Sequence, residues 1–346
     1  MSQKLRVPLK ALTSRCVPSY KTSCVSLLTP LPLSMHPLSP TNLSVNNLKH
    51  LRKQFSTTPA NMSASNNNFL LSEVFNVKGK VALITGGGSG IGLMATQALA
   101  VNGAKVYIVG RTKEKLDTVV KSHGQNIAGE IIPIVADVTQ KSEIAKLVKE
   151  IESREKCLCI LINNAGIAGS TQQTEAKTAE EMKKNLFDDE SSTFEDWVST
   201  YRTNVPQLFF MTTAFLPLLQ NASETHHGYS GTVINISSIS GIVQSSQHHF
   251  GYNASKAAAI HLTKLLASEI AENGLKIRVN SIAPGVFPSE MTAGESGGDQ
   301  KSHIEKDKRP GKDEDMAGAV LFTAANQYLN GQTIAVDGGY ILHAGA

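Results

Sequence analysis

Residues 80–101 contain the pattern that most restricts how this chain of 346 residues can fold. Residues 80–85, Lys-Val-Ala-Leu-Ile-Thr, have the apolar and β-branched character of a buried strand, and residues 93–101 are rich in alanine, as is typical of a helix. Five glycines lie in the segment between these two runs. A strand, a glycine turn and a helix in this order present backbone N–H groups and a helix N-terminus to a phosphate. The segment therefore predicts a unit that binds the pyrophosphate of a nucleotide cofactor.

Three of these glycines have separate expected roles. Gly86 permits the turn after the strand, Gly90 lets the phosphates approach the backbone, and Gly92 allows the helix to pack closely on the strand. Ser89 and Ile91 complete the expected phosphate-binding turn. The spacing differs from the common dinucleotide fingerprint, so a tight turn without a ligand is the alternative interpretation.

The rest of the chain alternates between strand and helix patterns. Strands are expected at residues 80–85, 105–109, 131–135, 158–162, 232–236, 276–281 and 332–336. Helices are expected at residues 93–101, 113–121, 141–153, 194–220, 253–273 and 313–325. This alternation predicts a single α/β domain with a doubly wound parallel sheet of the Rossmann type, which binds its ligand at the carboxyl ends of the strands.

Two polar segments fit no regular element. Residues 171–192 form a charge-rich insertion that we expect to be a surface excursion without a catalytic role. Residues 286–309 are also polar and contain Gly294, Gly297 and Gly298.

Positive charge is concentrated at the start of the chain. The net charge is +4, yet residues 1–60 hold eight lysines and arginines and no acid, which leaves 25 basic against 29 acidic residues in the remainder. A mildly acidic body argues against nucleic-acid binding. Residues 1–60 are also rich in Ser, Thr, Pro and Leu, the composition of a mitochondrial transit peptide.

We therefore expect import into the mitochondrial matrix, with a processing site near residues 52–59. The alternatives are a disordered basic extension and a start at Met62, which would give a cytoplasmic form. Residues 61–74 are expected to be a linker, and residues 75–346 the folded domain.

Two of the four cysteines, Cys16 and Cys24, lie in the expected leader, and Cys157 and Cys159 precede an apolar run. We expect the Cys-x-Cys pair to send its thiols to opposite faces of a strand, which would exclude a disulfide or a shared metal, and we predict no metal site. No apolar run reaches about 18 residues, so no membrane span is expected.

Tyr252 and Lys256 lie four residues apart in Tyr-Asn-Ala-Ser-Lys, so on a helix they share one face. A free tyrosine titrates near pH ~10, and a cation about 4–6 Å away favours its phenolate. The spacing predicts a tyrosine with a lowered pKa, suited to proton transfer, and Ser238 lies a short distance upstream. The alternative is an ordinary solvated helix face.

Four motifs resemble the short-chain dehydrogenase/reductase family in order and spacing. They are residues 85–92, Asn163-Asn164-Ala165-Gly166, Ser238 with Tyr252 and Lys256, and Pro284-Gly285. The resemblance covers about residues 75–346. Residues 282–292 and 331–339 are similar to a narrower group, the 3-oxoacyl-[acyl-carrier-protein] reductase of rhamnolipid synthesis and its fungal relatives.

The resemblance implies a sheet in the order 3-2-1-4-5-6-7 and a lid over the substrate at about residues 286–309. It also implies a role for each of four residues. Tyr252 is the general acid in carbonyl reduction and the base in the reverse reaction, and Lys256 lowers its pKa and holds the nicotinamide ribose. Ser238 donates a hydrogen bond to the substrate oxygen, and Asn204 holds a water that links Lys256 to solvent.

The resemblance also implies cofactor contacts beyond the glycine turn. Asp137 is expected at the adenine, and the adenosine ribose is expected to lie against Asn163, Ala165 and Gly166. Pro284 and Gly285, with Tyr252 and Lys256, are also expected to bind the cofactor.

The second strand indicates which nicotinamide cofactor is bound. An acid at its end would bind the ribose 2′-OH, but this chain has Gly110 at that position, followed by Arg111. An arginine suits a 2′-phosphate, so NADP(H) is predicted. A solvated turn residue is the alternative interpretation of Arg111.

Together these features predict an NADPH-dependent carbonyl reductase acting on a small-molecule ketone, with a 3-oxoacyl thioester as the first candidate. The alternatives are oxidation of a secondary alcohol or polyol in secondary metabolism, and a catalytically silent NADP-binding sensor. Family resemblance also implies a homodimer or homotetramer, with residues 253–273 and 336–346 as contact surfaces.

Overall fold

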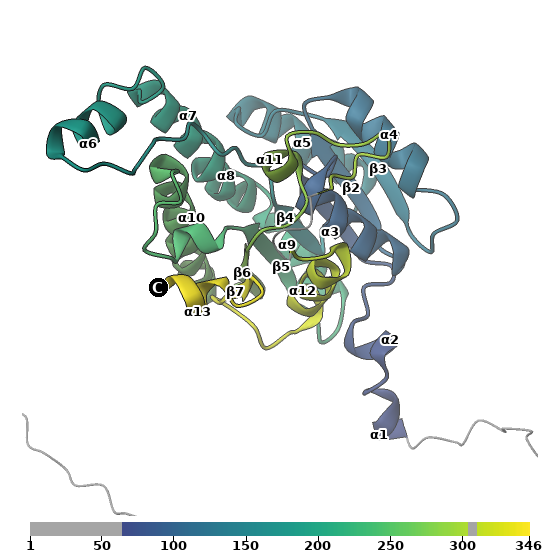
Figure 1. Ribbon diagram of the computed structural model, residues 1–346. Helices are drawn as coiled ribbons and strands as arrows, with labels where there is room; N and C mark the ends of the chain where they lie inside the picture. Colours follow the sequence, from purple (N-terminus) through teal and green to yellow (C-terminus); the bar gives the residue numbers. More distant parts are fainter. Residues whose placement is uncertain (1–63, 304–309) are drawn as a thin grey trace, which may run out of the picture. The chain divides into compact units, whose positions relative to one another are not determined.

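Seven parallel strands form one sheet, in the order β3-β2-β1-β4-β5-β6-β7. The computed structural model describes residues 64–303 and 310–346 (Figure 1). The strands are β1 Val81–Thr85, β2 Lys105–Gly110, β3 Glu130–Val135, β4 Ile160–Asn163, β5 Gly231–Ile236, β6 Ile277–Pro284 and β7 Thr333–Val336. The predicted fold class and strand order are confirmed.

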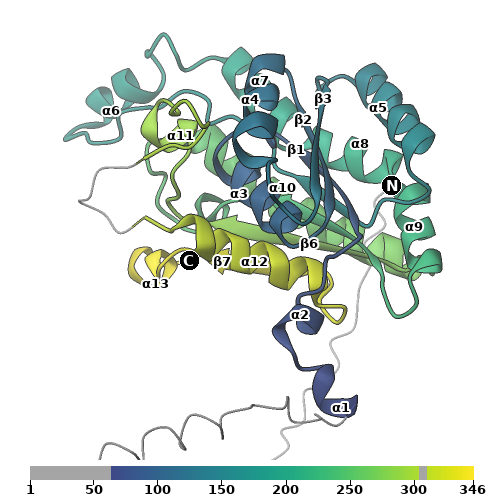
Figure 2. The ribbon, with the colours of Figure 1, turned by 90° about the vertical axis from the view of Figure 1, so that its right-hand side faces the viewer.

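Helices cover both faces of the sheet, which is why its central strands are buried throughout instead of alternating between buried and exposed residues. All residues of β1, β4, β5 and β6 are buried. One core cluster joins the sheet mainly to α3 Gly90–Val101, α4 Lys113–His123 and α12 Asp313–Ala325, and it also includes Ala222. The other joins it to α5 Lys141–Arg154, α8 Pro206–Ala214, α9 Leu216–Thr225 and α10 Phe250–Glu272. In Figure 2, α5 and α8 lie across the sheet from α12.

The helix predicted at residues 194–220 is three helices in the structure. Helix α7 Phe194–Asn204 ends before Pro206, which begins α8, and Pro217 lies in the first turn of α9. A proline has no N–H to donate and its ring crowds the preceding turn, so each proline starts a new helix. The prediction of a continuous helix was wrong at these two positions.

The insertion at residues 171–192 contains a helix that was not predicted, α6 Ala179–Leu186. The side chain of Thr178 accepts a hydrogen bond from the Glu181 backbone N–H, an N-cap that stabilises the first turn. The segment lies on the outside of the fold, away from the sheet, as expected (Figure 1).

Short helices also occur at both ends of the domain and in the expected lid. Helices α1 Ala64–Asn67 and α2 Leu71–Val74 lie in the expected linker, and α13 Tyr340–Ala344 ends the chain. The expected lid contains α11 Glu290–Ala293, and its residues 304–309 lie outside the described residues, as do the expected transit peptide, its processing site and Met62. Within residues 64–303 and 310–346, no helix is both long and apolar enough to cross a membrane.

Candidate active site

A cavity of about 440 Å³ opens at the carboxyl ends of the strands, the position predicted for the ligand. All but three of the predicted site residues line it. They are Gly86, Ser89, Gly90, Ile91, Arg111, Asp137, Ala165, Gly166, Ser238, Tyr252, Lys256, Pro284 and Gly285. The three that do not line the cavity are Gly92, Asn163 and Asn204, and all three are buried behind it.

The glycine turn has the backbone geometry that its sequence predicts. Gly86 and Gly90 have φ angles of 65° and 52°, a region that side chains strongly disfavour. A Cβ at Gly92 would lie 2.1 Å from the carbonyl oxygen of Gly86, so only glycine allows α3 to start this close to β1. The backbone of the turn is therefore open to a ligand because it lacks side chains.

Asn163 acts inside the sheet instead of at the cavity wall. Its Nδ2 donates a hydrogen bond to Asn235 Oδ1 at 2.9 Å, and Asn235 Nδ2 donates to Thr263 Oγ1 at 2.9 Å. These contacts tie β4 to β5 and α10. The structure therefore places Asn163 as a support for the site, while its neighbours Ala165 and Gly166 reach the cavity.

Helix α10 brings Tyr252 and Lys256 to the cavity, and β5 leads into Ser238, which lines the same cavity. The Lys256 Nζ donates a hydrogen bond to the Ile236 carbonyl oxygen at 2.9 Å and lies 5.6 Å from the centre of the Tyr252 ring. Ser238 caps the 3-10 helix η3 Ile239–Gly241, accepting a hydrogen bond from the Ser240 N–H. The three side chains predicted to perform the chemistry therefore meet in one place.

Burial has the largest effect on the pKa values of Tyr252 and Lys256. It raises the pKa of Tyr252, although contact with the Ser238 side chain acts to lower it. Burial also lowers the pKa of Lys256 to about 8. The lowered pKa predicted for Tyr252 is therefore wrong for the protein without ligand, because loss of water around the phenol outweighs its favourable contacts. A neutral phenol is the form that can donate a proton.

Asn204 holds the loop beside Lys256. Its Oδ1 accepts a hydrogen bond from the Ile167 N–H at 2.9 Å, and its Nδ2 donates to the Ile167 carbonyl at 2.9 Å and to Ser255 Oγ at 3.0 Å. A Cβ at Gly166 would lie 3.1 Å from Asn204 Oδ1 and 3.6 Å from Lys256 Nζ. Asn204 thus joins the loop after β4 to helix α10 and lies next to the lysine.

Arg111 is exposed and lies at the rim of the cavity, directly after β2. Asp137, after β3, accepts hydrogen bonds from the backbone N–H and the hydroxyl of Thr139 at 2.9 and 2.8 Å. Burial acts to raise the pKa of Asp137, but these hydrogen bonds and the charge of Arg111 leave it below its ordinary value. The carboxylate is therefore ionised and close to the guanidinium.

The described part of the expected lid reaches over the glycine turn. A Cβ at Gly90 would lie 2.8 Å from the Cβ of Ser289. Lys115, on α4, donates hydrogen bonds to both carboxylate oxygens of Glu290 at 2.6 and 2.8 Å, and this contact leads the causes that lower the pKa of Glu290. The pair links the lid to the wall of the cavity that carries Arg111.

Sequence reasoning missed several residues of the cavity wall, including Lys115, Ile167 and Phe287. A signal existed for Lys115, because it follows Arg111 by four residues at the start of a predicted helix. Nothing in the linear pattern distinguished Ile167 and Phe287 from other apolar residues.

The prediction that Cys157 and Cys159 point to opposite faces is wrong. Residues i and i+2 of an extended segment lie on the same face, and both cysteines belong to one core cluster while Leu158 belongs to the other. Their sulfurs lie within 4.8 Å of each other and of a ring nitrogen of His226.

Comparison with known proteins places these features in a family. The sequence model of the short chain dehydrogenase family matches residues 80–299. The chain is 38% identical to the short-chain dehydrogenase/reductase PhomF of Diaporthe leptostromiformis over 286 residues, which cover 79% of this chain and 94% of PhomF. It is 32% identical to the rhamnolipids biosynthesis 3-oxoacyl-[acyl-carrier-protein] reductase of Pseudomonas aeruginosa, over 78% of this chain and 98% of that protein.

A solved structure, that of Pseudomonas aeruginosa RhlG with NADP in its active site, superposes with a TM-score of 0.62. The sequence identity is 30%, and the match covers 77% of this chain and 98% of that one. Fold, cavity and relatives together define an NAD(P)-dependent oxidoreductase that acts on carbonyl or CH–OH groups. The chain belongs to the short-chain dehydrogenase/reductase family, as its motifs predicted.

Proposed function

We propose that this protein is an NADPH-dependent carbonyl reductase that transfers hydride to a ketone, with a 3-oxoacyl thioester as its first candidate substrate. One observation carries the proposal: Ser238, Tyr252 and Lys256 line the same cavity as the glycine turn. A proton donor and a hydrogen-bond donor thus share one space with the backbone suited to a dinucleotide phosphate.

The chemistry follows from these positions. The reduced nicotinamide supplies a hydride to the carbonyl carbon. Tyr252 donates its phenolic proton to the carbonyl oxygen, and Ser238 donates a hydrogen bond that stabilises the negative charge developing there. Lys256, next to the phenol, stabilises the phenolate that remains. The raised pKa of Tyr252 keeps the phenol protonated before the reaction, as reduction requires.

The cofactor proposal rests on the charge at the end of β2. Gly110 offers no carboxylate to a ribose 2′-OH, and the cations of Arg111 and Lys115 both line the cavity beside it. Arginine pairs well with a phosphate, because its planar fork presents two parallel donors. The solved RhlG structure is a complex with NADP, in agreement with this choice.

The cofactor proposal is tested by comparing the Michaelis constants for NADPH and NADH. Arg111→Asp should raise the constant for NADPH about 10- to 100-fold, since a hydrogen bond to a charged group contributes about 1.5–3 kcal/mol. Lys121→Asp is the matched control, because Lys121 lies on α4 outside the cavity lining. Equal use of both cofactors by the wild type contradicts the proposal.

The substrate proposal rests on the relatives, since a 3-oxoacyl-[acyl-carrier-protein] reductase is 32% identical over most of its length. The direct test is NADPH oxidation by the wild type with acetoacetyl thioesters, diketones and quinones. Turnover of the thioesters supports the proposal. Turnover only in the oxidative direction, with secondary alcohols or polyols, supports the alternative dehydrogenase, and tight NADPH binding without turnover supports a silent sensor.

We also propose that residues 1–60 direct the protein into the mitochondrial matrix and that Met62 gives a cytoplasmic form. The acid-free, basic composition supports this proposal. N-terminal sequencing of the protein isolated from mitochondria tests it, and a mature chain that begins at Met1 contradicts it.

A homodimer or homotetramer is proposed on the basis of exposed apolar side chains. Leu265 on α10 is 49% exposed and Leu342 on α13 is 93% exposed, on the two segments predicted to make subunit contacts. Light scattering coupled to gel filtration measures the mass, and a monomer contradicts the proposal.

A further inference from the structure

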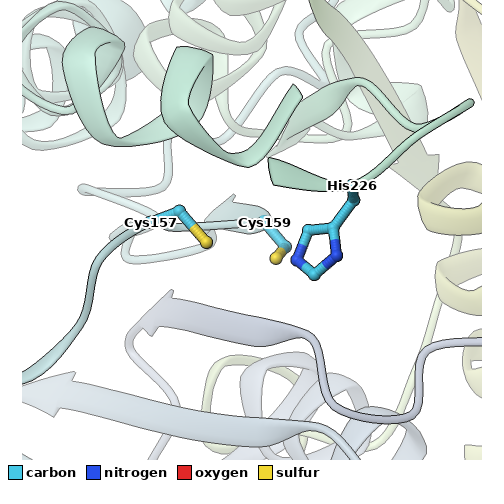
Figure 3. A group of neighbouring side chains, drawn as sticks. All are labelled: Cys157, Cys159 and His226. Carbon is cyan, nitrogen blue, oxygen red and sulfur yellow. The ribbon is translucent and has the colours of Figure 1, made fainter. Parts of the chain in front are cut away.

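Three side chains with metal-binding chemistry meet at the edge of the sheet opposite the active site. The Sγ atoms of Cys157 and Cys159 and a ring nitrogen of His226 all lie within 4.8 Å of one another. Figure 3 shows the His226 ring beside the Cys159 sulfur, with Cys157 next along the same segment. The cysteines come from the segment that enters β4, and His226 is the residue that caps the C-terminus of α9.

The backbone fixes this group at the amino ends of the strands. The Cys159 N–H donates to the Val81 carbonyl, and the Cys159 carbonyl accepts from the Thr232 N–H, each at 2.9 Å. Val81 and Thr232 lie at the starts of β1 and β5. Two strands therefore hold Cys159 in place, and a ligand bound there would not touch the cavity at the carboxyl ends.

The thiols are screened from water, but the imidazole is not. Cys159 is 0% exposed and Cys157 is 7% exposed, whereas His226 is half-buried. The ring of Tyr229 packs edge-on against His226, with centroids 5.9 Å apart, and its hydroxyl donates to the Cys159 carbonyl at 3.0 Å. His226 therefore gives the group its contact with water, and a water is the fourth ligand that a four-coordinate site would need.

The ammonium of Lys80 near this group favours the ligand forms of both residue types, the neutral imidazole and the thiolate. Burial, together with the ammonium of Lys80, lowers the pKa of His226, so the imidazole is neutral, the form that binds a metal. Burial raises the pKa of Cys159 to about 12, while Lys80 acts to lower it. The Cys159 thiol is therefore protonated in the absence of an ion, and an ion that binds it must displace its proton.

The separations are close to those of a tetrahedral zinc site. With Zn–S about 2.3 Å and Zn–N about 2.0–2.1 Å, ligand atoms lie about 3.5–3.8 Å apart. The three atoms lie within 4.8 Å of one another, so a contraction of at most about 1 Å brings them to that geometry. Two sulfurs and one imidazole form a ligand set that Zn²⁺ prefers over Mg²⁺ or Ca²⁺.

We propose that Cys157, Cys159 and His226 bind Zn²⁺ or a similar thiophilic divalent cation. Binding converts two thiols to thiolates, so two protons are released for each ion bound, and two metal–sulfur bonds and one metal–nitrogen bond form. The ion joins the end of α9 to the start of β4. It therefore stabilises the domain without changing the chemistry at the other edge of the sheet.

Cobalt provides the probe, because Co²⁺ takes the place of Zn²⁺ and gives an absorption band when thiolates bind it. The full chain is titrated with Co²⁺ after removal of any affinity tag, in a Cys16→Ser/Cys24→Ser background that removes the other two cysteines of the sequence. The expected result is a thiolate-to-cobalt band that saturates at one equivalent and is displaced by Zn²⁺. Calorimetry in buffers of different ionisation enthalpy should report the release of about two protons.

Two variants and one control test the assignment. Cys159→Ala and His226→Ala should each weaken Co²⁺ binding at least tenfold, whereas His227→Ala, which alters the adjacent exposed histidine, should leave it unchanged. Circular dichroism verifies that each variant is folded. If Cys159→Ala fails to fold, Cys157→Ser and His226→Gln provide the same comparison.

A saturating band that is lost in the ligand variants and kept in His227→Ala supports the site. Absence of the thiolate band in the parent, or its persistence in both ligand variants, overturns the proposal. A Zn²⁺-dependent rise in melting temperature with unchanged NADPH turnover further separates this site from the catalytic one.

Discussion

Each of the two edges of the parallel sheet, carboxyl and amino, carries a group of ionisable side chains, and the surroundings of the two groups differ. At the carboxyl edge, Tyr252 and Lys256 face a cavity of about 440 Å³. At the amino edge, Cys157, Cys159 and His226 pack against one another, with Lys80 nearby. Burial raises the pKa of Tyr252 and of Cys159 and lowers the pKa of Lys256 and of His226, so in each case it favours the neutral form.

The two groups differ in the ligand that can stabilise the charged forms of their side chains. At the carboxyl edge, the cavity can admit a cofactor and a substrate, and the phenol and ammonium lie at its wall. At the amino edge, the two thiols and the imidazole lie within 4.8 Å of one another, so a metal ion bound between them would be the counter-charge for two thiolates. Desolvated polar groups thus indicate different ligands according to the space beside them.

The largest predicted effect is on kcat, which a substitution at the carboxyl edge should lower and a substitution at the amino edge should leave nearly unchanged. Lys256→Met should reduce kcat for carbonyl reduction about 100-fold, because the phenolate left after proton transfer loses its stabilising cation. Cys159→Ala, a buried substitution at the opposite edge, should leave kcat within about twofold of the wild type. Steady-state NADPH oxidation measures both. Equal losses in the two variants would mean that the edges do not act separately.

The pH dependence sharpens the same comparison. Because burial lowers the pKa of Lys256 to about 8, the ammonium is present below that pH and lost above it. The kcat for reduction should therefore fall above pH 8, approaching about tenfold per pH unit. A profile that stays flat up to pH 10 would exclude the lysine charge from the rate.

The free energy of unfolding at high pH shows whether a loss of activity above pH 8 is caused by unfolding. An unfolded lysine titrates near pH ~10.4, so between about pH 8 and that value the unfolded chain binds more protons at Lys256 than the folded chain. The contribution of this residue to the free energy of unfolding therefore rises with pH across the window. Loss of its charge would thus reduce activity without weakening the fold.

Asn204 should stabilise the structure at the carboxyl edge of the sheet. Asn204→Ala removes three hydrogen bonds that join Ile167 and Ser255, and should lower the free energy of unfolding by about 1–3 kcal/mol. Asn221→Ala is the matched control, since its exposed side chain makes one long hydrogen bond of 3.4 Å, and it should change stability by less than about 0.5 kcal/mol. Urea unfolding measures both. Equal values would show that the Asn204 contacts contribute little.

The smallest predicted effect concerns the ion pair between Glu290 of the expected lid and Lys115 of the cavity wall. Glu290→Gln should free Lys115 for the cofactor phosphate and tighten NADPH binding about two- to fivefold, a small change because the pair is 42% and 34% exposed. The same variant should leave NADH binding unchanged. Fluorescence titration measures both constants, and weaker NADPH binding would contradict the proposed role of Lys115.

Much of the fold followed from local patterns. The strand order agreed with the family resemblance, and every predicted strand overlaps an observed one, with its start within two residues and its end within three. The helix breaks at Pro206 and Pro217 and the N-cap at Thr178 carried local signals that were overlooked.

The candidate active site was predictable because its residues are close in the sequence or belong to motifs. Tyr252 and Lys256 share one helix face, and Gly86, Gly90 and Gly92 share one turn. Long-range packing was not predictable in this way. Nothing in the sequence places His226 beside Cys157 and Cys159, since the fold of α9 and β4 creates that contact.

The central claim is that Tyr252 donates the proton in the cavity at the carboxyl edge. The most direct measurement is single-turnover NADPH oxidation by Tyr252→Phe, with NADPH affinity measured in parallel by fluorescence. We predict an affinity within about twofold of the wild type and a rate lower by a factor of about 10² or more. A variant that binds NADPH normally and retains a rate within about tenfold of the wild type would contradict this claim.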